Sequence, residues 1–410
     1  MGGICQNVVC MHKSTLITMI SAAALAMTAE GAAPEHFQPK AKELLADSIE
    51  LEKNAHNLNV IYFVGNDMEP TADYERRISE LLLYLQQYYG KEMVRNGFGN
   101  HSFGLERTEN GNVNIILLRG KHPHKFYKYG SGHGPCLKEI NDWFAANPGK
   151  KQSQHSFIIM PTWQDEGYND KNPGGVPFYG YGKDCFALDY TDFDIKHLGQ
   201  PTKEGKLLTK WYGGFAHELG HGMNLPHNNG TVSMNKAFGT PLMGSGNYTF
   251  GMSPTYLTPA SCAILANTEI FVPETNKTSF YTNEKEPQVY NATFKRRGGT
   301  LELFLEVSAD VVRVNAYVQD PPYAVNQDYD AVSFTCNTGT DKNGKRVAGL
   351  IIPLNELSNL RHHKGGEMEL GILFQTNDGS RFRWKIPFDL NKQAAGSLIN
   401  TGKPQLHRGY

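Results

Sequence analysis

The chain has 410 residues, of which 40% are hydrophobic and 11% aromatic. This is more apolar material than one hydrophobic core usually holds, so we expect two folded units. The 40 Lys and Arg residues against 41 Asp and Glu leave a formal net charge of -1. A chain without a charge excess has no overall field that would draw it to nucleic acid or to anionic lipid, which disfavours functions of those classes.

The N-terminus has the pattern of a secretory signal peptide. Lys13 precedes an apolar run from Leu16 to Met27, and small residues follow at Ala29, Gly31, Ala32 and Ala33. The run is about half the roughly 20 residues that a transmembrane helix needs. We therefore expect a leader over residues 1–33, a secreted protein in an extracellular or periplasmic space, and no integral membrane span.

Four cysteines remain once such a leader is removed, namely Cys136, Cys185, Cys262 and Cys336. An oxidising compartment would allow them to pair in three ways. A chain of this size does not need disulfides, and Cys262 lies in an apolar helical stretch where it fits a small buried hydrophobe. The sequence leaves the pairing open.

Strands and helices alternate in the first half of the chain, after a polar segment at residues 34–56. Apolar runs predict strands at 60–64, 114–118 and 156–160, and helical spacing predicts helices at 72–94 and 136–146. This alternation favours an α/β layer domain over residues 57–271. Residues 165–182 are rich in Gly, Asn, Asp and Tyr and predict a loop, after which we expect a helix that begins near Leu207 or Trp211.

The composition and the residue pattern of the sequence change after Phe271. Residues 272–288 are rich in Pro, Asn, Thr and Glu and predict a linker. Beyond them Leu301, Leu303 and Leu305 alternate with other residues, and short apolar runs recur between turn signals at 312–318, 331–334, 350–354, 370–374 and 382–388. This pattern is typical of a small antiparallel β-sandwich, here over residues 289–410.

The stretch from Gly213 to Asn229, GGFAHELGHGMNLPHNN, contains a candidate metal site. His217 and His221 are four residues apart, so a helix places both imidazoles on one face, within reach of one ion. Zn²⁺ suits such ligands, because three neutral nitrogens leave a fourth position open for water. Glu218 is rotated about 100° from His217 on the helix. We expect it to act as the catalytic base on the zinc-bound water rather than as a ligand.

His227 is the candidate third ligand. It follows His221 by six residues, too far to share one helical face, so the chain must leave the helix and turn back. Asn224 is suited to the left-handed conformation that ends a helix, and Pro226 stops the helix from resuming. We therefore expect a positive φ at Asn224, a position where Gly should be tolerated and the β-branched Val should not.

The string from His217 to His227 resembles the signature of the metzincin clan of zinc endopeptidases, HExxHxxGxxH followed by a methionine-containing turn. Asn224 stands where the clan has glycine, which makes the motif a HExxHxxNxxH variant. The run from Pro241 to Gly244 is the candidate methionine turn. The resemblance implies that Met243 supports the single zinc ion from below without coordinating it.

The resemblance also implies a fold, an α/β (α+β) metzincin-like catalytic domain followed by the β-sandwich. It covers residues 57–271, with residues 258–268 as a closing helix, although only the segment from His217 to Met243 carries specific motifs. Tyr248 would be near the metal by analogy with tyrosines in some clan members, but its spacing from Met243 does not match theirs. Ordinary packing remains the alternative for this tyrosine.

Together these features predict a secreted zinc-dependent endopeptidase that acts on a protein or peptide. The substrate would pair with an edge strand, for which Ser156–Met160 is the candidate. Two alternatives remain open. The same zinc site could hydrolyse a non-peptide amide or ester, or the protein could be a catalytically inert binding protein that uses its β-sandwich. The sandwich itself could bind a glycan or a surface partner, or only stabilise the catalytic domain.

Overall fold

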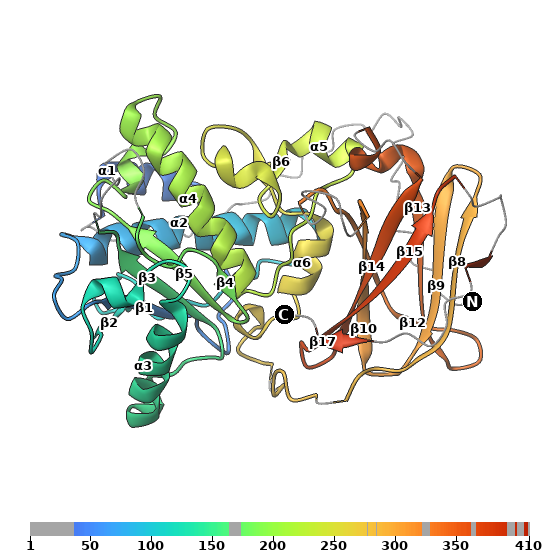
Figure 1. Ribbon diagram of the computed structural model, residues 1–410, viewed down its shortest axis with the longest axis horizontal. Helices are drawn as coiled ribbons and strands as arrows, with labels where there is room; N and C mark the ends of the chain where they lie inside the picture. Colours follow the sequence, from blue (N-terminus) through green and yellow to red (C-terminus); the bar gives the residue numbers. More distant parts are fainter. Residues whose placement is uncertain are drawn as a thin grey trace, which may run out of the picture.

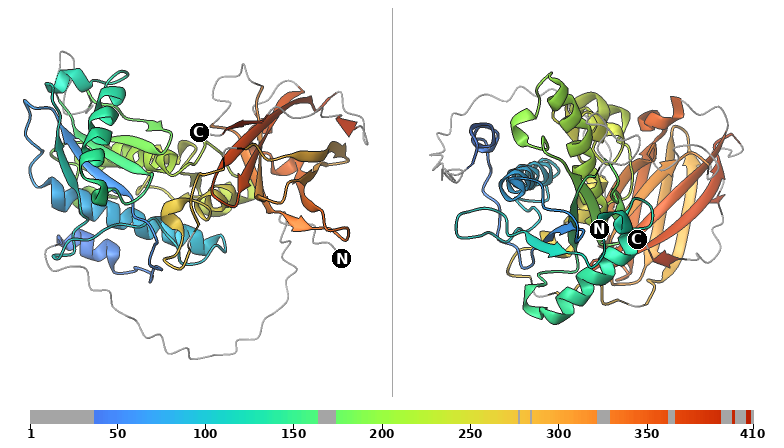
Figure 2. Two further views of the ribbon diagram at one scale, coloured as in Figure 1. Left: turned by 90° about the horizontal axis from the view of Figure 1, so that it is seen from below. Right: turned by 60° about the vertical axis from the view of Figure 1, so that its left-hand side comes forward.

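The computed structural model describes residues 37–163, 174–276, 278–283, 285–321, 329–361, 366–391, 398–399 and 406–408. The expected leader and much of the loop expected at 165–182 lie outside these residues. The described chain forms an N-terminal α/β part and a C-terminal β part (Figure 1). Figure 2 shows the same two parts from two other directions. Within the described residues no helix combines the length and the apolar character that crossing a bilayer requires.

A five-stranded sheet with the order β2-β1-β3-β5-β4 organises the N-terminal part. Its strands are β1 (Asn59–Val64), β2 (Ile116–Arg119), β3 (Ser156–Pro161), β4 (Gly180–Tyr181) and β5 (Asp184–Asp189). Strands β2, β1, β3 and β5 pair in parallel, and β4 pairs antiparallel with β5. Every residue of β1 and β3 is buried, as expected of parallel strands covered on both faces.

The position of β3 in this sheet corrects one expectation. We expected Ser156–Met160 to be an edge strand for the substrate, but β3 lies between β1 and β5. The free edge beside the candidate site is β4, a strand of two residues that the sequence pattern did not reveal. The order of strands depends on contacts between distant segments, so an apolar run alone does not distinguish a central strand from an edge strand.

Six α-helices accompany this sheet in the described residues, namely α1 (Pro39–Leu45), α2 (Tyr74–Arg95), α3 (His133–Ala146), α4 (Lys203–Gly222), α5 (Val232–Phe238) and α6 (Pro259–Leu265). Helices α2 and α3 agree with the expected ones. Helix α4 begins earlier than Leu207, because the Thr202 hydroxyl accepts a hydrogen bond from the Gly205 N–H at 3.1 Å and caps the helix there. The expected helix at 258–268 is the shorter α6, capped by Thr258.

Short elements complete this part. Two-residue strands β6 (Thr240–Pro241) and β7 (Thr255–Tyr256) pair in parallel. The 3₁₀-helices of the described chain are His124–Tyr127, Pro148–Lys150, Ile195–His197, Ser245–Tyr248, Glu269–Phe271, Leu354–Glu356 and Ser358–Arg361. All four cysteines expected in the mature chain are buried free thiols, so none of the three disulfide pairings forms.

The C-terminal part consists of two five-stranded antiparallel sheets, with the orders β11-β10-β14-β15-β17 and β12-β13-β9-β8-β16. The strands are β8 (Val289–Arg297), β9 (Thr300–Val307), β10 (Val311–Gln319), β11 (Val332–Asn337), β12 (Gly339–Thr340), β13 (Arg346–Pro353), β14 (Glu367–Thr376), β15 (Arg381–Asp389), β16 (Leu398–Ile399) and β17 (His407–Arg408). Leu301, Leu303 and Leu305 lie in the core that these sheets share, as their alternation indicates. Strand β8 was not expected, because polar residues dominate its sequence.

The sheet that contains β10 packs against the N-terminal part. Arg313 donates a hydrogen bond to the Ala263 carbonyl at 2.6 Å, and Asn315 donates one to the Ala260 carbonyl at 3.0 Å. Tyr317 of the same strand belongs to the hydrophobic core of the N-terminal part. The segment expected as a linker is also packed, since Tyr281 is hydrogen-bonded to His155 at 2.7 Å. The two parts therefore share a continuous interior.

A buried ion pair joins α2 to the carboxyl end of the sheet. The Arg77 guanidinium contacts both carboxylate oxygens of Asp189, at 2.6 and 2.9 Å, and the side chains are 3% and 0% exposed. The Tyr62 hydroxyl donates a third hydrogen bond to Asp189 at 2.7 Å. Loss of one partner would leave a buried charge without compensation.

We expect Arg77→Met to lower the free energy of unfolding by about 3–5 kcal/mol, because it leaves the Asp189 carboxylate buried and uncompensated. Urea denaturation followed by circular dichroism measures this change. The matched control is Arg119→Met, which removes an exposed ion pair to Glu69 (2.5 Å) and should cost about 1 kcal/mol or less. Equal losses in the two variants would contradict this interpretation of the buried pair.

Candidate metal centre

Helix α4 carries the first two candidate ligands, and its glycines allow close packing of the last turn. A Cβ at Gly220 would lie 2.5 Å from Met243 Sδ, and one at Gly222 would collide with Cys185 of β5. Larger residues at these positions would push the helix away from both neighbours. The glycines therefore keep the end of the helix pressed between the sheet and the loop that contains Met243.

The structure brings His217, His221 and His227 together. Their Nε2 atoms are 3.1 Å apart between His217 and His221, 3.0 Å between His221 and His227, and 3.2 Å between His217 and His227. A triangle of this size accommodates an ion about 2.0–2.1 Å from each nitrogen, with one side open. Among the described residues, these three form a group that could hold a metal ion.

Hydrogen bonds fix the protonation of two of these rings. His217 Nδ1 lies 2.8 Å from the Leu242 carbonyl, and His221 Nδ1 lies 2.7 Å from the Leu225 carbonyl. Because a carbonyl only accepts, each Nδ1 carries the proton and each Nε2 presents a lone pair. Lone pairs that face one another at about 3 Å repel each other unless a cation lies between them. The donor set therefore fits a transition metal that accepts imidazole nitrogen.

Burial also favours the neutral form of the three imidazoles. It lowers the pKa of His217 and of His227 to about 3, and the neighbouring imidazoles contribute to the lowering. Burial likewise lowers the pKa of His221. Neutral imidazoles are the form that binds metals.

The chain reversal that places His227 is a complete helix-ending motif. The Asn224 N–H donates to the His221 carbonyl at 2.8 Å, and the Leu225 N–H donates to the Gly220 carbonyl at 2.9 Å. Asn224 has a φ of 77°, which confirms the positive φ predicted from its type and position. The Leu225 carbonyl also accepts a hydrogen bond from His221. This one turn therefore orients the imidazole of His221 and brings His227 next to it.

Asn224 is also held from the C-terminal part, through contacts that the sequence did not reveal. Arg381 of β15, which is buried, donates to the Asn224 backbone carbonyl and, at 2.8 Å, to its side-chain oxygen. The Asn224 amide donates to the Tyr281 hydroxyl at 3.1 Å. His155 bonds both that hydroxyl and the Gly222 carbonyl, each at 2.7 Å. The amide side chain at the position where the metzincin motif has glycine thus connects the turn to the second part of the molecule.

Glu218 follows His217 on α4 and lines the same cavity as His221 and His227. Burial raises the pKa of its carboxyl to about 8, opposed by a hydrogen bond from the Gly180 backbone. Gly180 belongs to the edge strand β4. The carboxyl group is therefore placed between the candidate ligands and the edge strand, where its ionised form could take a proton from a water molecule.

Met243 and Tyr248 differ in their surroundings. Met243 is buried against Gly220, and its own carbonyl accepts a hydrogen bond from the Asn228 N–H at 3.1 Å. Tyr248 is 62% exposed on a 3₁₀-helix and does not line the cavity. The aromatic ring that does lie on the ligands is Tyr329, which stacks on His227 at a centroid distance of 3.8 Å. More than 100 residues separate Tyr329 from His227, so spacing gave no signal for it.

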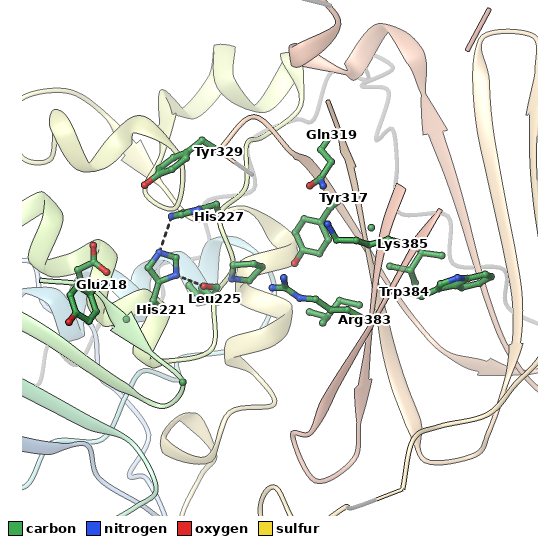
Figure 3. Close-up of a pocket in the computed structure, with 17 residues that line it drawn as sticks. Glu218, His221, Leu225, His227, Tyr317, Gln319, Tyr329, Arg383, Trp384 and Lys385 are labelled. Atoms are coloured by element: carbon green, nitrogen blue, oxygen red, sulfur yellow. Dashed lines mark hydrogen bonds between the residues drawn. The ribbon is translucent and has the colours of Figure 1, made fainter. Parts of the chain in front are cut away.

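A cavity of about 460 Å³ lies between the two parts of the molecule (Figure 3). The N-terminal part lines it with Tyr179, Gly180, Gly182, Glu218, His221, Leu225, Pro226 and His227. The C-terminal part lines it with Tyr317, Gln319, Tyr329, Gly371, Ile372, Leu373, Arg383, Trp384 and Lys385. The candidate site is thus an interface between both parts, and not a feature of the N-terminal part alone.

No protein-family model and no curated protein matches the chain. Among solved structures, the chain is similar to wild-type OgpA from Akkermansia muciniphila, with a TM-score of 0.81 and 49% identity over 86% of this chain and 98% of that one. A catalytically inactive OgpA in complex with an O-glycopeptide (glycodrosocin) substrate gives a TM-score of 0.81 and 47% identity, over 89% and 99% of the two chains.

The chain belongs to the OgpA family. A second crystal form of wild-type OgpA agrees, with a TM-score of 0.79 and 47% identity over 89% of this chain and 98% of that one. The protein is therefore an enzyme, a hydrolase of peptide bonds, as the sequence motif predicted. The match extends over both parts of the molecule, so the C-terminal part belongs to the shared architecture.

The contacts of Asn224 modify the substitution series expected from sequence. We expect Asn224→Gly to keep the turn but lower the free energy of unfolding by about 1–3 kcal/mol, since the buried Arg381 loses its side-chain acceptor. Asn224→Val should cost more, because Val strongly disfavours a positive φ. Asn224→Asp keeps the acceptor and serves as the control. Thermal unfolding of the three variants measures the order, and a Gly variant as stable as the native protein would show that the Arg381 contact contributes nothing.

Proposed function

We propose that the protein is a secreted zinc endopeptidase that hydrolyses O-glycopeptides, with a metzincin-like catalytic domain followed by a β-sandwich. The observation that carries the proposal is the convergence of three imidazole Nε2 atoms beside Glu218 at one cavity. The substrate class rests on OgpA, which was crystallised with an O-glycopeptide substrate and shares 47% identity with this chain. Secretion rests on the apolar N-terminal run alone.

The chemistry divides between the ion and the chain. When bound, zinc supplies a Lewis acid that polarises the scissile carbonyl and increases the acidity of water. His217, His221 and His227 hold it as neutral nitrogen ligands. Glu218 accepts the proton of the attacking water and returns it to the leaving amine.

Strand β4 is suited to hold the peptide. It is the edge of the N-terminal sheet beside the site, and Gly180 and Gly182 line the cavity. An extended substrate that pairs with this edge would lay its backbone across the imidazole triangle. The absence of side chains at Gly180 and Gly182 lets the substrate backbone approach closely. We therefore assign to β4 the role expected from sequence for Ser156–Met160.

Two alternatives are weaker. An inert binding protein is disfavoured, because the chain belongs to an enzyme family and retains Glu218 at the cavity. Hydrolysis of a non-peptide amide or ester would need the same zinc and the same base. It differs in not requiring the edge strand, and the family relationship favours peptide substrates.

We expect Glu218→Gln to bind zinc normally and to lose peptide hydrolysis by at least about a hundredfold, because the amide cannot accept the proton of water. Elemental analysis and cleavage of an O-glycopeptide followed by mass spectrometry measure the two properties. His227→Ala should instead lose the metal as well as activity. Full activity of Glu218→Gln would exclude Glu218 as the base.

Metal removal tests the proposed ion separately. Prolonged dialysis against a chelator should abolish cleavage, and addition of one equivalent of Zn²⁺ should restore it. The apo protein should also unfold at a lower temperature, since the three imidazoles then face one another without a cation. Unchanged cleavage by a protein shown to contain no metal would overturn the zinc proposal.

A further inference from the structure

Strand β15 presents two different faces. Phe382, Trp384, Ile386 and Phe388 belong to the hydrophobic core between the C-terminal sheets. Because side chains alternate along a strand, Arg381, Arg383 and Lys385 point to the opposite face. That face borders the N-terminal part, and Arg383 and Lys385 both line the cavity beside the candidate ligands.

The outer two of these three cations have partners in the protein. Arg381 donates to Asn224, as described above. Lys385 Nζ lies 2.8 Å from a carboxylate oxygen of Glu369, whose side chain is 5% exposed. Glu369 therefore neutralises the charge of Lys385, and Asn224 accepts hydrogen bonds from Arg381.

Arg383, between them, has no such partner. Within the part of the chain that the structure describes, its guanidinium forms neither an ion pair nor a side-chain hydrogen bond. Figure 3 shows the side chain extending from β15 toward Leu225, beside the ring of Tyr317. Its charge also acts on the metal centre, since it contributes to the lowered pKa values of His221 and His227.

An unpaired guanidinium in a partly buried cavity is poorly solvated, so it has a strong tendency to acquire an anionic partner. No acidic side chain of the described residues supplies that partner, because the nearby Glu369 is already bound to Lys385 and Gln319. The substrate is the remaining source. A carboxylate matches the planar guanidinium best, because it accepts two parallel hydrogen bonds.

We propose that Arg383 determines specificity by pairing with a carboxylate of the substrate. This inference rests on the proposed peptidase function and adds a preference that the family relationship does not specify. The carboxylate comes from an acidic amino acid near the scissile bond or from an acidic sugar of the O-glycan. Both sources present the same group to Arg383, so substrates must distinguish them.

The test compares three O-glycopeptides that share one peptide frame. The first has Gln at the positions flanking the scissile bond, the second has Glu there, and the third has the Gln peptide with an acidic sugar on its glycan. For the native enzyme we expect kcat/KM to be about tenfold or more higher for one of the two carboxylate substrates than for the neutral one. Arg383→Gln should reduce that ratio to near one, and Arg383→Lys should retain part of it.

Lys385→Gln is the matched control, because it removes a cation from the same strand and cavity but one that Glu369 already neutralises. Its ratio should stay within about twofold of the native ratio. An equal loss in both variants would overturn the assignment to Arg383. It would indicate that the overall positive charge of the cavity, and not pairing with Arg383, produces the preference. A native enzyme without preference for either carboxylate substrate would overturn the proposal itself.

Binding separates this proposal from the proposed peptidase function. The affinity of the three glycopeptides for Glu218→Gln, measured by calorimetry, reports the carboxylate preference without turnover. If the native enzyme cleaves none of them, the peptidase proposal fails while the preference remains measurable. Equal affinities, or no binding, for the carboxylate and neutral peptides would overturn the role of Arg383 regardless of cleavage.

Discussion

The molecule depends on one electrostatic arrangement, three imidazole Nε2 atoms held 3.0 to 3.2 Å apart, of which those of His217 and His221 present lone pairs to each other. This is unfavourable without a cation, so the rest of the fold must hold the rings in place. Backbone carbonyls do this for two of the rings, since those of Leu242 and Leu225 accept hydrogen bonds from Nδ1 of His217 and His221. A prepared ligand set of this kind would need little rearrangement to bind a metal ion.

The weakest part of that arrangement is the chain reversal after α4, because it requires a positive φ outside glycine. The C-terminal part compensates by holding Asn224 through Arg381, and Tyr281 holds the same side chain from the connecting segment. Residues separated by 157 positions in sequence thus determine the geometry of one turn. This explains why the two parts share an interior: the position of His227 depends on both of them.

The sequence predicted the local features of the site and missed those that depend on distant contacts. The spacing of His217 and His221 places them on one helical face and rotates Glu218 away from it, and the residue type of Asn224 was enough to predict its φ. These properties depend on a few neighbouring residues. The placement of β3 inside the sheet and the stacking of Tyr329 on His227 arise from contacts between segments far apart in sequence, which no local pattern encodes.

Strand β15 shows why the C-terminal part is more than a stabilising layer. Its alternating pattern predicted a strand, and the aromatic residues on one face lie in the core between the C-terminal sheets. The basic residues on the other face would be unremarkable on an exposed strand. Here one of them fixes the turn that positions a candidate ligand, and another enters the cavity without a partner in the described chain. A strand in the second part of the molecule therefore contributes both to the shape of the candidate metal site and to the electrostatic field in the cavity beside it.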